Sequence, residues 1–393
     1  MNAYFSGIPF PALRGQLRGR VQEGTVHILW YLAALALIAP VYLGHFPVAV
    51  YAAFQGIIYA TSLAAYAFLA MKIYFWDEHS RGELLAITQC LILLILGTAV
   101  SKNRCFLSSF LLALSCKGLP FPKICRFFFW FFAAGLVLNL LLVAAGVLED
   151  AVTVRGELWG NGNLRHSLGF GHPNTLGFWG MLLVFSGLLS FYRSRKDFPT
   201  VLALLAGSCL LFRLTDSKAA FFSSLLAIFL CLLLRPLSPK LAGKKWVRFG
   251  CPAMMLLIVL TFLTLCFLYR PDSGFFRLCN LVLSDRLGYA NQGIHSFGFS
   301  LFGAQVDFRW DPVDSFYAYA PICLGVVPSL VYFGLHLWSM YRAAENGCWG
   351  IVAVAFAGML YGTMEYGLMN PIHLPLFAAA AALPGESGRK SSV

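Results

Sequence analysis

The feature that most constrains this chain is a succession of long apolar runs separated by short polar breaks. An α-helix needs about 20 predominantly apolar residues to cross the hydrocarbon core of a bilayer, and most of these runs approach or reach that length. Charged residues make up only 12% of the 393, whereas about 25% is usual in soluble domains. The sequence therefore predicts an all-α integral membrane protein.

We expect about twelve transmembrane helices, with ten as the lower bound, in a single membrane domain over residues 26–383. Tails 1–25 and 384–393 flank this domain. Two runs, 105–116 and 201–212, are short, and we expect them to be tilted, broken or partly re-entrant. The predicted spans are Val26–Leu43, Val48–Met71, Leu84–Val100, Cys105–Cys116, Phe127–Leu148, Pro173–Tyr192, Val201–Phe212, Ala219–Leu234, Cys251–Leu268, Tyr317–Tyr341, Ile351–Gly367 and Ile372–Leu383.

The basic residues predict the orientation of these spans. With the N-terminus inside and strict alternation, 19 of the 29 Lys and Arg residues lie in cytoplasmic segments, including a cluster at 235–248. Cytoplasmic loops carry such an excess in bacterial inner-membrane proteins, so both termini are expected in the cytoplasm. The two longest loops, about 149–172 and 269–316, then face the extracytoplasmic side. They also hold an unusual share of Gly, Asn, His, Arg, Asp and Trp.

Two further compositional features exclude some classes of protein. The formal net charge of +12 would suggest nucleic acid in a soluble protein, but here the basic residues lie in short breaks between apolar runs, so no nucleic-acid partner is expected. The eleven cysteines show no CxxC pair and no paired spacing, so neither a disulfide framework nor a zinc site is predicted.

The first candidate site is the segment 165–177, which reads RHSLGFGHPNTLG at the outer entrance of a predicted helix. Pro173 suits the first turn of that helix, and Asn174 can satisfy free backbone N–H groups there. A helix N-terminus beside Arg165 would bind an anion. His172 is a candidate base. An ordinary Gly-rich turn that caps a helix explains the same spacing about equally well.

The second candidate site is the segment RLTDSK at 213–218, between two apolar runs. A tight turn with Ser or Asp as the next N-cap is the simpler interpretation. However, Arg213, Asp216 and Lys218 bring more charge than a turn between short helices needs. Charge at membrane depth is costly unless it lines a water-filled or ligand-filled cavity, which favours a functional role.

The second long loop supplies further candidates. Residues 276–294 alternate apolar and polar side chains at roughly helical spacing, which predicts a helix lying on the membrane or closing over a cavity, with Arg286 on it. Asp311 and Asp314 precede the next span, where acidic residues serve as helix-dipole partners or as general bases. Glu365 lies near the outer end of a predicted span, and a carboxylate there is either functional or merely hydrated.

In their order along the chain, several of these segments resemble the O-antigen ligase and Wzy-type polymerase superfamily. The resemblance covers about residues 80 to 380. Its most specific part is the Gly-His-Pro-Asn run. The segments concerned are Arg165 with GFGHPN and Gly177, then TDSK at 215–218, DRL at 285–287, LFG at 301–303, and DSFY at 314–317 with Gly325.

The resemblance implies a helical membrane glycosyltransferase that moves a glycan from undecaprenyl pyrophosphate to an acceptor at the outer face of the inner membrane, without a metal or other cofactor. Arg165 and Arg286, with Arg213, would hold the pyrophosphate. Asn174, Lys218 and Glu365 would complete the substrate site. A chain-length regulator and a flippase are the partners it implies. Lys218 stands where the family often has arginine, which keeps the charge but loses the planar fork.

Two residues remain candidates for the catalytic base, His172 and Asp314. Asp314 falls where ligases often carry a histidine, and this difference favours a polymerase of lipid-linked repeat units over a ligase. The chemistry agrees with the residues, since arginines can stabilise a pyrophosphate leaving group and no Asp-x-Asp pair for a metal-bound nucleotide sugar is present.

A flippase or other transporter is the competing class. Transporters usually carry charges at mid-bilayer and broken helices in repeated positions, whereas the predicted span centres here are almost free of charge. A regulatory or assembly subunit with degenerate motifs is a third interpretation, and it predicts that replacing Arg165 or Arg286 leaves activity intact.

Overall fold

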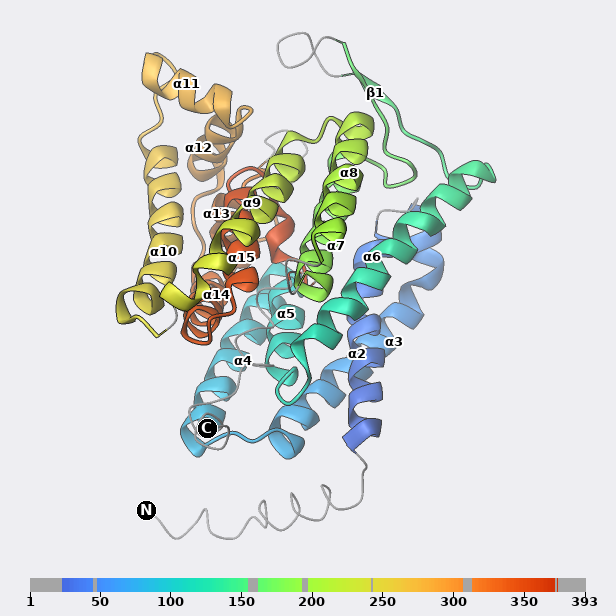
Figure 1. Ribbon diagram of the computed structural model, residues 1–393, viewed down its shortest axis with the longest axis vertical. Helices are drawn as coiled ribbons and strands as arrows, with labels where there is room; N and C mark the ends of the chain where they lie inside the picture. Colours follow the sequence, from blue (N-terminus) through green and yellow to red (C-terminus); the bar gives the residue numbers. More distant parts are fainter. Residues whose placement is uncertain are drawn as a thin grey trace.

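The computed structural model describes residues 23–44, 48–154, 162–192, 197–241, 243–306, 313–371 and 373. Within them the chain forms a helical bundle with a short β-hairpin at one end (Figure 1). The predicted tails 1–25 and 384–393 and the last predicted span, Ile372–Leu383, fall almost wholly outside the described residues.

The first part of the bundle precedes the hairpin. It consists of α2 (Glu23–Leu43), α3 (Val48–Met71), η1 (Lys72–Trp76), α4 (Arg81–Ser101), α5 (Cys105–Ser115) and α6 (Phe121–Ala144). The hairpin pairs β1 (Thr153–Val154) antiparallel with β2 (Leu164–Arg165).

The second part follows the hairpin and ends in a short 3-10 turn. It consists of α7 (Pro173–Phe191), α8 (Phe198–Thr215), α9 (Lys218–Leu241), α10 (Lys245–Phe267), α11 (Gly274–Val282), α12 (Arg286–Phe297), α13 (Phe316–Tyr319), η3 (Ala320–Leu324), α14 (Val326–Glu345), α15 (Trp349–Tyr361) and η4 (Tyr366–Met369).

The described residues contain eight helices that are long and apolar enough to span a membrane, which supports the membrane class of the sequence prediction. They are α2, α3 with η1, α4, α6, α7, α8, α9 and α10. α5 and α15 are shorter apolar helices. α14 has 20 residues but is less apolar than these spans. The prediction of twelve spans therefore exceeds the eight that meet the length and apolarity criteria in the described part of the chain.

Several predicted boundaries differ from the observed ones, each for a local reason. The run 201–212, expected to be short, lies within the full-length helix α8, because Pro199 suits its first turn and Arg213 and Thr215 extend its end. The helix expected over 276–294 is two helices, α11 and α12, because Ser284 and Asp285 adopt left-handed backbone conformations between them.

The span expected over Tyr317–Tyr341 is broken. Gly325, with φ of 99°, separates η3 from α14. The backbone N–H groups of Ser300 and Ala304 donate to the carbonyls of Pro321 and Cys323, at 3.3 and 3.0 Å. These hydrogen bonds attach the segment 300–304 to the broken part of the span. The run 351–367 likewise ends as a helix at Tyr361, and Glu365 lies in the turn between α15 and η4.

The core of the bundle lies around α7, which is buried along most of its length and packs against α6, α8 and α9. Gly177 on α7 allows the start of α9 to approach closely, since a Cβ there would lie 2.4 Å from the Ser217 Cβ. By contrast, α3, α4, α6, α8 and α10 expose many large apolar side chains, as expected for helices whose outer faces contact lipid. This packing brings the starts of α7, α9 and α12 to one end of the bundle.

Candidate functional site

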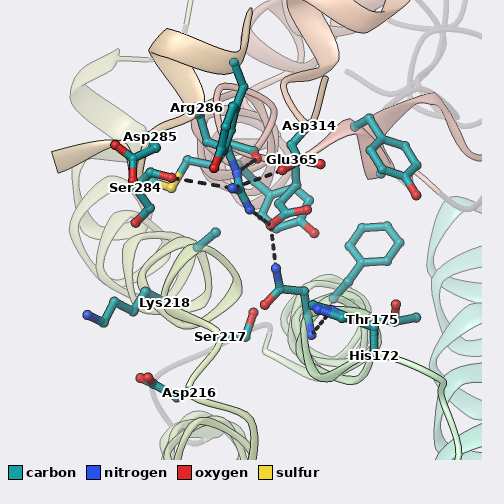
Figure 2. A pocket seen from close by; sticks show the side chains of 18 of the residues that line it. His172, Thr175, Asp216, Ser217, Lys218, Ser284, Asp285, Arg286, Asp314 and Glu365 are labelled. Carbon is teal, nitrogen blue, oxygen red and sulfur yellow. Dashed lines mark hydrogen bonds and ion pairs between the residues drawn. The ribbon is translucent and has the colours of Figure 1, made fainter. Parts of the chain in front are cut away.

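A cavity of about 620 Å³ is lined by side chains from several segments of the chain (Figure 2). These segments meet at the end of the bundle that carries the hairpin, α11 and α12 (Figure 1). The cavity walls come from β2, the starts of α7, α9 and α12, the residues before α13, and the turn after α15. Of the eight residues expected to act in catalysis or substrate binding, all but Arg213 line it, and they are Arg165, His172, Asn174, Lys218, Arg286, Asp314 and Glu365.

Arg286 is the first residue of α12, and its guanidinium lies between two carboxylates (Figure 2). Nη1 is 3.0 Å from Oδ2 of Asp314, and Nη2 is 3.3 Å from Oε1 of Glu365. Nε donates to the Met364 carbonyl at 2.9 Å. The side chain is only 17% exposed, so these contacts fix its planar head at the cavity wall.

Arg165 lies on β2, and its contacts continue the same network. Its Nε donates to the Thr215 carbonyl at 2.7 Å, and its Nη2 donates to Oδ1 of Asn174 at 2.5 Å. The Asn174 amide in turn donates from Nδ2 to Oε1 of Glu365 at 3.0 Å. A single Glu365 oxygen therefore joins the two arginines, directly to Arg286 and through Asn174 to Arg165.

The segment that carries Arg165 is held by a carboxylate that the sequence analysis did not single out. Asp150 accepts hydrogen bonds from the backbone N–H groups of Ser167 and Leu168, at 2.9 and 2.8 Å, and its Oδ2 is 2.6 Å from Nδ1 of His166. Burial raises the pKa of Asp150, but these hydrogen bonds outweigh it and hold the pKa below its usual value. Asp150 and His166 thus position the loop. Because they are 16 residues apart, no short motif in the sequence indicated that they interact.

His172 is the N-cap of α7, where its Nδ1 accepts a hydrogen bond from the Asn174 backbone N–H at 3.1 Å. Partial burial of the ring, together with Arg165, lowers its pKa against the opposing effect of Asp314. The ring is therefore neutral near pH 7. Since Nδ1 is occupied as an acceptor, the ring proton belongs on Nε2, which makes that atom a donor.

The two carboxylates beside Arg286 differ in their surroundings. Burial, reinforced by the charge of Asp314, raises the pKa of Glu365 to about 7, although Arg286 opposes the shift. The Asp314 side chain is 27% exposed and that of Glu365 14%, so Asp314 is the more open to the cavity. Both carboxylates contact Arg286, and Glu365 is the one whose pKa lies near neutral pH.

Lys218 begins α9 and lines the cavity beside Asp216 and Ser217, whereas Arg213 does not line it. Arg213 is in the last turn of α8 and exposed, so the predicted third arginine of the phosphate site is not brought to the other two. Asp311 lies outside the described residues.

The cavity is also lined by residues to which the sequence gave no role in the site. They are Asp285, Tyr289, Tyr361 and Tyr366. Asp285 could have been found from the sequence, because it directly precedes Arg286. The tyrosines had no such signal, because aromatic side chains are frequent throughout the apolar runs. Among the described residues no group of three or more His, Cys, Asp or Glu side chains could hold a metal ion.

Comparisons of the chain with models of known protein families, with curated proteins and with solved structures find no match.

Proposed function

We propose that this protein is a membrane glycosyltransferase that polymerises undecaprenyl-pyrophosphate-linked oligosaccharide repeat units at the outer face of the bacterial cytoplasmic membrane. The observation that carries the proposal is the guanidinium of Arg286, which lies in a polar cavity at one end of an apolar helical bundle, between Asp314 and Glu365. A cation for the leaving group and a carboxylate for the acceptor are thus present within one site.

Arginine suits the leaving group. In the transfer, the bond between the donor sugar C1 and the phosphate oxygen breaks, and undecaprenyl pyrophosphate departs with the electron pair. Negative charge grows on the bridging oxygen as it leaves. Guanidinium groups held at a partly buried wall stabilise this charge through directed N–H bonds, and Arg165 and Arg286 are both held in this way. Lys218 adds a third positive charge at the cavity wall.

Asp314 is the better candidate for the base. The acceptor hydroxyl must lose its proton as its oxygen attacks C1 from the face opposite the leaving group, which inverts the anomeric centre. A carboxylate open to the cavity can accept this proton. His172 suits the role less well because its acceptor nitrogen caps α7, so its other nitrogen donates. We assign His172 to donating a hydrogen bond toward the substrate.

The membrane setting fits substrates of this kind. A lipid-linked glycan keeps its polyprenyl chain in the bilayer and its pyrophosphate near the interface, which fits a polar cavity at one end of a bundle of apolar helices. The excess of Lys and Arg in the loops at the other side favours the extracytoplasmic orientation of the cavity. A chain-length regulator and a flippase remain the partners that this function would need.

Reconstitution tests the proposal. The purified protein is placed in liposomes with undecaprenyl-pyrophosphate-linked repeat units, and the products are separated on a gel. We expect a ladder of increasing length that the Arg286→Ala and Arg165→Ala variants lose and the Arg277→Ala variant keeps, because Arg277 is exposed on α11 and does not line the cavity. Passage of intact lipid-linked units across the bilayer without a ladder would contradict the proposal and favour a transporter.

A ligase would behave differently in the same system. It would transfer the glycan once to an added acceptor of another kind and would form no ladder from the lipid-linked units alone.

A further inference from the structure

Glu365 holds a position that an anionic ligand would take. Its Oε1 accepts from the Asn174 amide at 3.0 Å and lies 3.3 Å from Nη2 of Arg286. Amide and guanidinium N–H groups are the donors that bind phosphate oxygens in proteins. The contact with Arg286 is longer than the roughly 2.7–2.9 Å of a strong charge-assisted bond. The carboxylate therefore occupies an anion-binding site, and its contact with Arg286 there is weak.

The charges of this network cancel while Glu365 is ionised. Arg165 and Arg286 supply two positive charges, and Asp314 and Glu365 supply two negative ones, so the four groups together offer no net attraction to a pyrophosphate diester with two ionised oxygens. If Glu365 takes up a proton, the network gains one net positive charge. When the Glu365 side chain moves, the N–H groups of Arg286 and Asn174 that donated to it also become available to another acceptor.

We propose that Glu365 is an internal placeholder for a substrate phosphate, which displaces it from Arg286 and Asn174 while the carboxylate takes up one proton from solvent. This inference rests on the proposed function, since it names the state of the same site before the donor binds. The balance is simple: one proton from water converts the displaced carboxylate to a carboxylic acid, and no bond between heavy atoms changes. Donor binding is then linked to pH through this residue.

The surroundings of Glu365 support the proton uptake. Arg286 of α12 and Arg165 of β2 favour its ionised form, whereas Asp314 favours the neutral form. The phenolic side chains of Tyr361 and Tyr366 lie close enough to interact with its charge. Burial decides among these effects, and the resulting pKa of about 7 means that neutralising Glu365 near neutral pH costs little free energy.

Binding of a non-reacting diester tests this inference. Farnesyl methyl pyrophosphate carries no sugar and keeps both phosphates ionised between pH 6 and 8, so its own titration does not interfere. Its binding to the full-length protein in nanodiscs is measured by calorimetry at pH 6 and pH 8, and at pH 8 in two buffers of different ionisation enthalpy. We expect Kd to rise about tenfold from pH 6 to pH 8, with uptake of about one proton per diester bound at pH 8.

Variants separate Glu365 from its neighbours. Glu365→Gln should bind the diester at pH 8 about as tightly as the original protein does at pH 6, with no proton uptake, because the amide carries no charge and does not titrate. His172→Asn keeps the N-cap and should leave the proton uptake in place. Glu149→Gln makes the same chemical change at an exposed position that does not line the cavity and should alter neither quantity.

Three results would overturn the inference: no proton uptake by the original protein, an unchanged pH dependence in Glu365→Gln, or no binding of the diester at pH 6. The first two are measured on the unmodified protein and on a variant, so a folding failure of Glu365→Gln leaves the buffer comparison intact. Failure of the proposed function would be detected by a separate measurement, elongation in liposomes. It would appear as proton-linked binding of the diester without elongation of lipid-linked repeat units in liposomes.

Discussion

Arg286 and its two carboxylates show how much a single side chain contributes to this site. The guanidinium uses Nε on the Met364 carbonyl and its two terminal nitrogens on Asp314 and Glu365, so all three nitrogens are directed by contacts. A lysine ammonium carries the same charge but cannot reach three acceptors in one plane. Geometry, beyond charge, is therefore what the position demands.

Arg286→Lys is expected to reduce the turnover rate of elongation by about 100-fold or more, because removing a directed donor from a charge-stabilising site typically costs that much. The rate is measured as repeat units added per minute in liposomes. Arg277→Lys is the matched control and should keep its rate, since Arg277 is exposed on α11. A lysine variant with normal turnover would show that charge alone suffices.

The choice of base makes a second prediction. Asp314→Asn should lower kcat for elongation by about 100-fold or more, the usual effect of losing a general base. His172→Asn should lower it less than about tenfold, because asparagine preserves the N-cap of α7 and His172 is assigned only a donated hydrogen bond. The reverse order of the two effects, measured at saturating substrate, would move the base to His172.

At the scale of elements, two features position the site: the loop between β2 and α7, and the break between η3 and α14. The Asp150 carboxylate holds the loop, and the His166 backbone N–H donates to the Leu214 carbonyl at 2.8 Å. The break holds the segment that leads to Asp314, while the Phe316 N–H donates to the Gly362 carbonyl at 2.9 Å. The loop thus positions Arg165 and His172 at the cavity, and the segment before α13 positions Asp314.

Asp150→Ala is expected to destabilise the protein by about 2 kcal/mol, because two backbone N–H groups and His166 lose their acceptor. Thermal unfolding in detergent measures the effect, with the exposed Glu149→Ala as control. Since the folded pKa of Asp150 is depressed, its stabilisation is fully present above its unfolded pKa and is lost as pH falls through the folded value. The destabilisation should therefore be fully present at pH 8, and equal stability of variant and original at that pH would contradict this role.

Gly325→Ala should be strongly destabilising, by about 2 kcal/mol or more. Its φ of 99° disfavours any side chain, and an added Cβ would lie 2.4 Å from the Gly303 backbone nitrogen. Gly334→Ala, within α14, meets no atom within 4 Å and should be neutral or slightly stabilising. The two melting temperatures in detergent make the comparison. Equal values would mean that the break at Gly325 tolerates a side chain.

At the scale of the whole molecule, the sequence predicts the membrane class because apolar length is a local property that each helix displays by itself. Seven of the eight candidate site residues lie at one cavity in the structure, and they were noticed in the sequence because polar residues that interrupt apolar runs are costly unless they serve a site. Arg213 does not line the cavity, and its exposure depends on the rotation of α8, which no short motif specifies.

The remaining differences have a tertiary origin. The break at Gly325 and the split of α11 from α12 depend on contacts made by distant segments, although Pro321 and Gly325 were local signals of the first. The role of Asp150 depends on a hydrogen-bonded loop whose partners lie 16 to 18 residues away. Pairings at that separation leave no periodic pattern in the sequence.

We propose above that this cavity transfers a glycan from a lipid pyrophosphate. This proposal is tested most directly by counting the undecaprenyl pyrophosphate released for each new glycosidic linkage in liposomes that contain the purified protein and lipid-linked repeat units. We predict a ratio of one released lipid per linkage, with both quantities falling together in Arg286→Ala. Linkages without released lipid pyrophosphate, or equal release by the variant, would contradict the account.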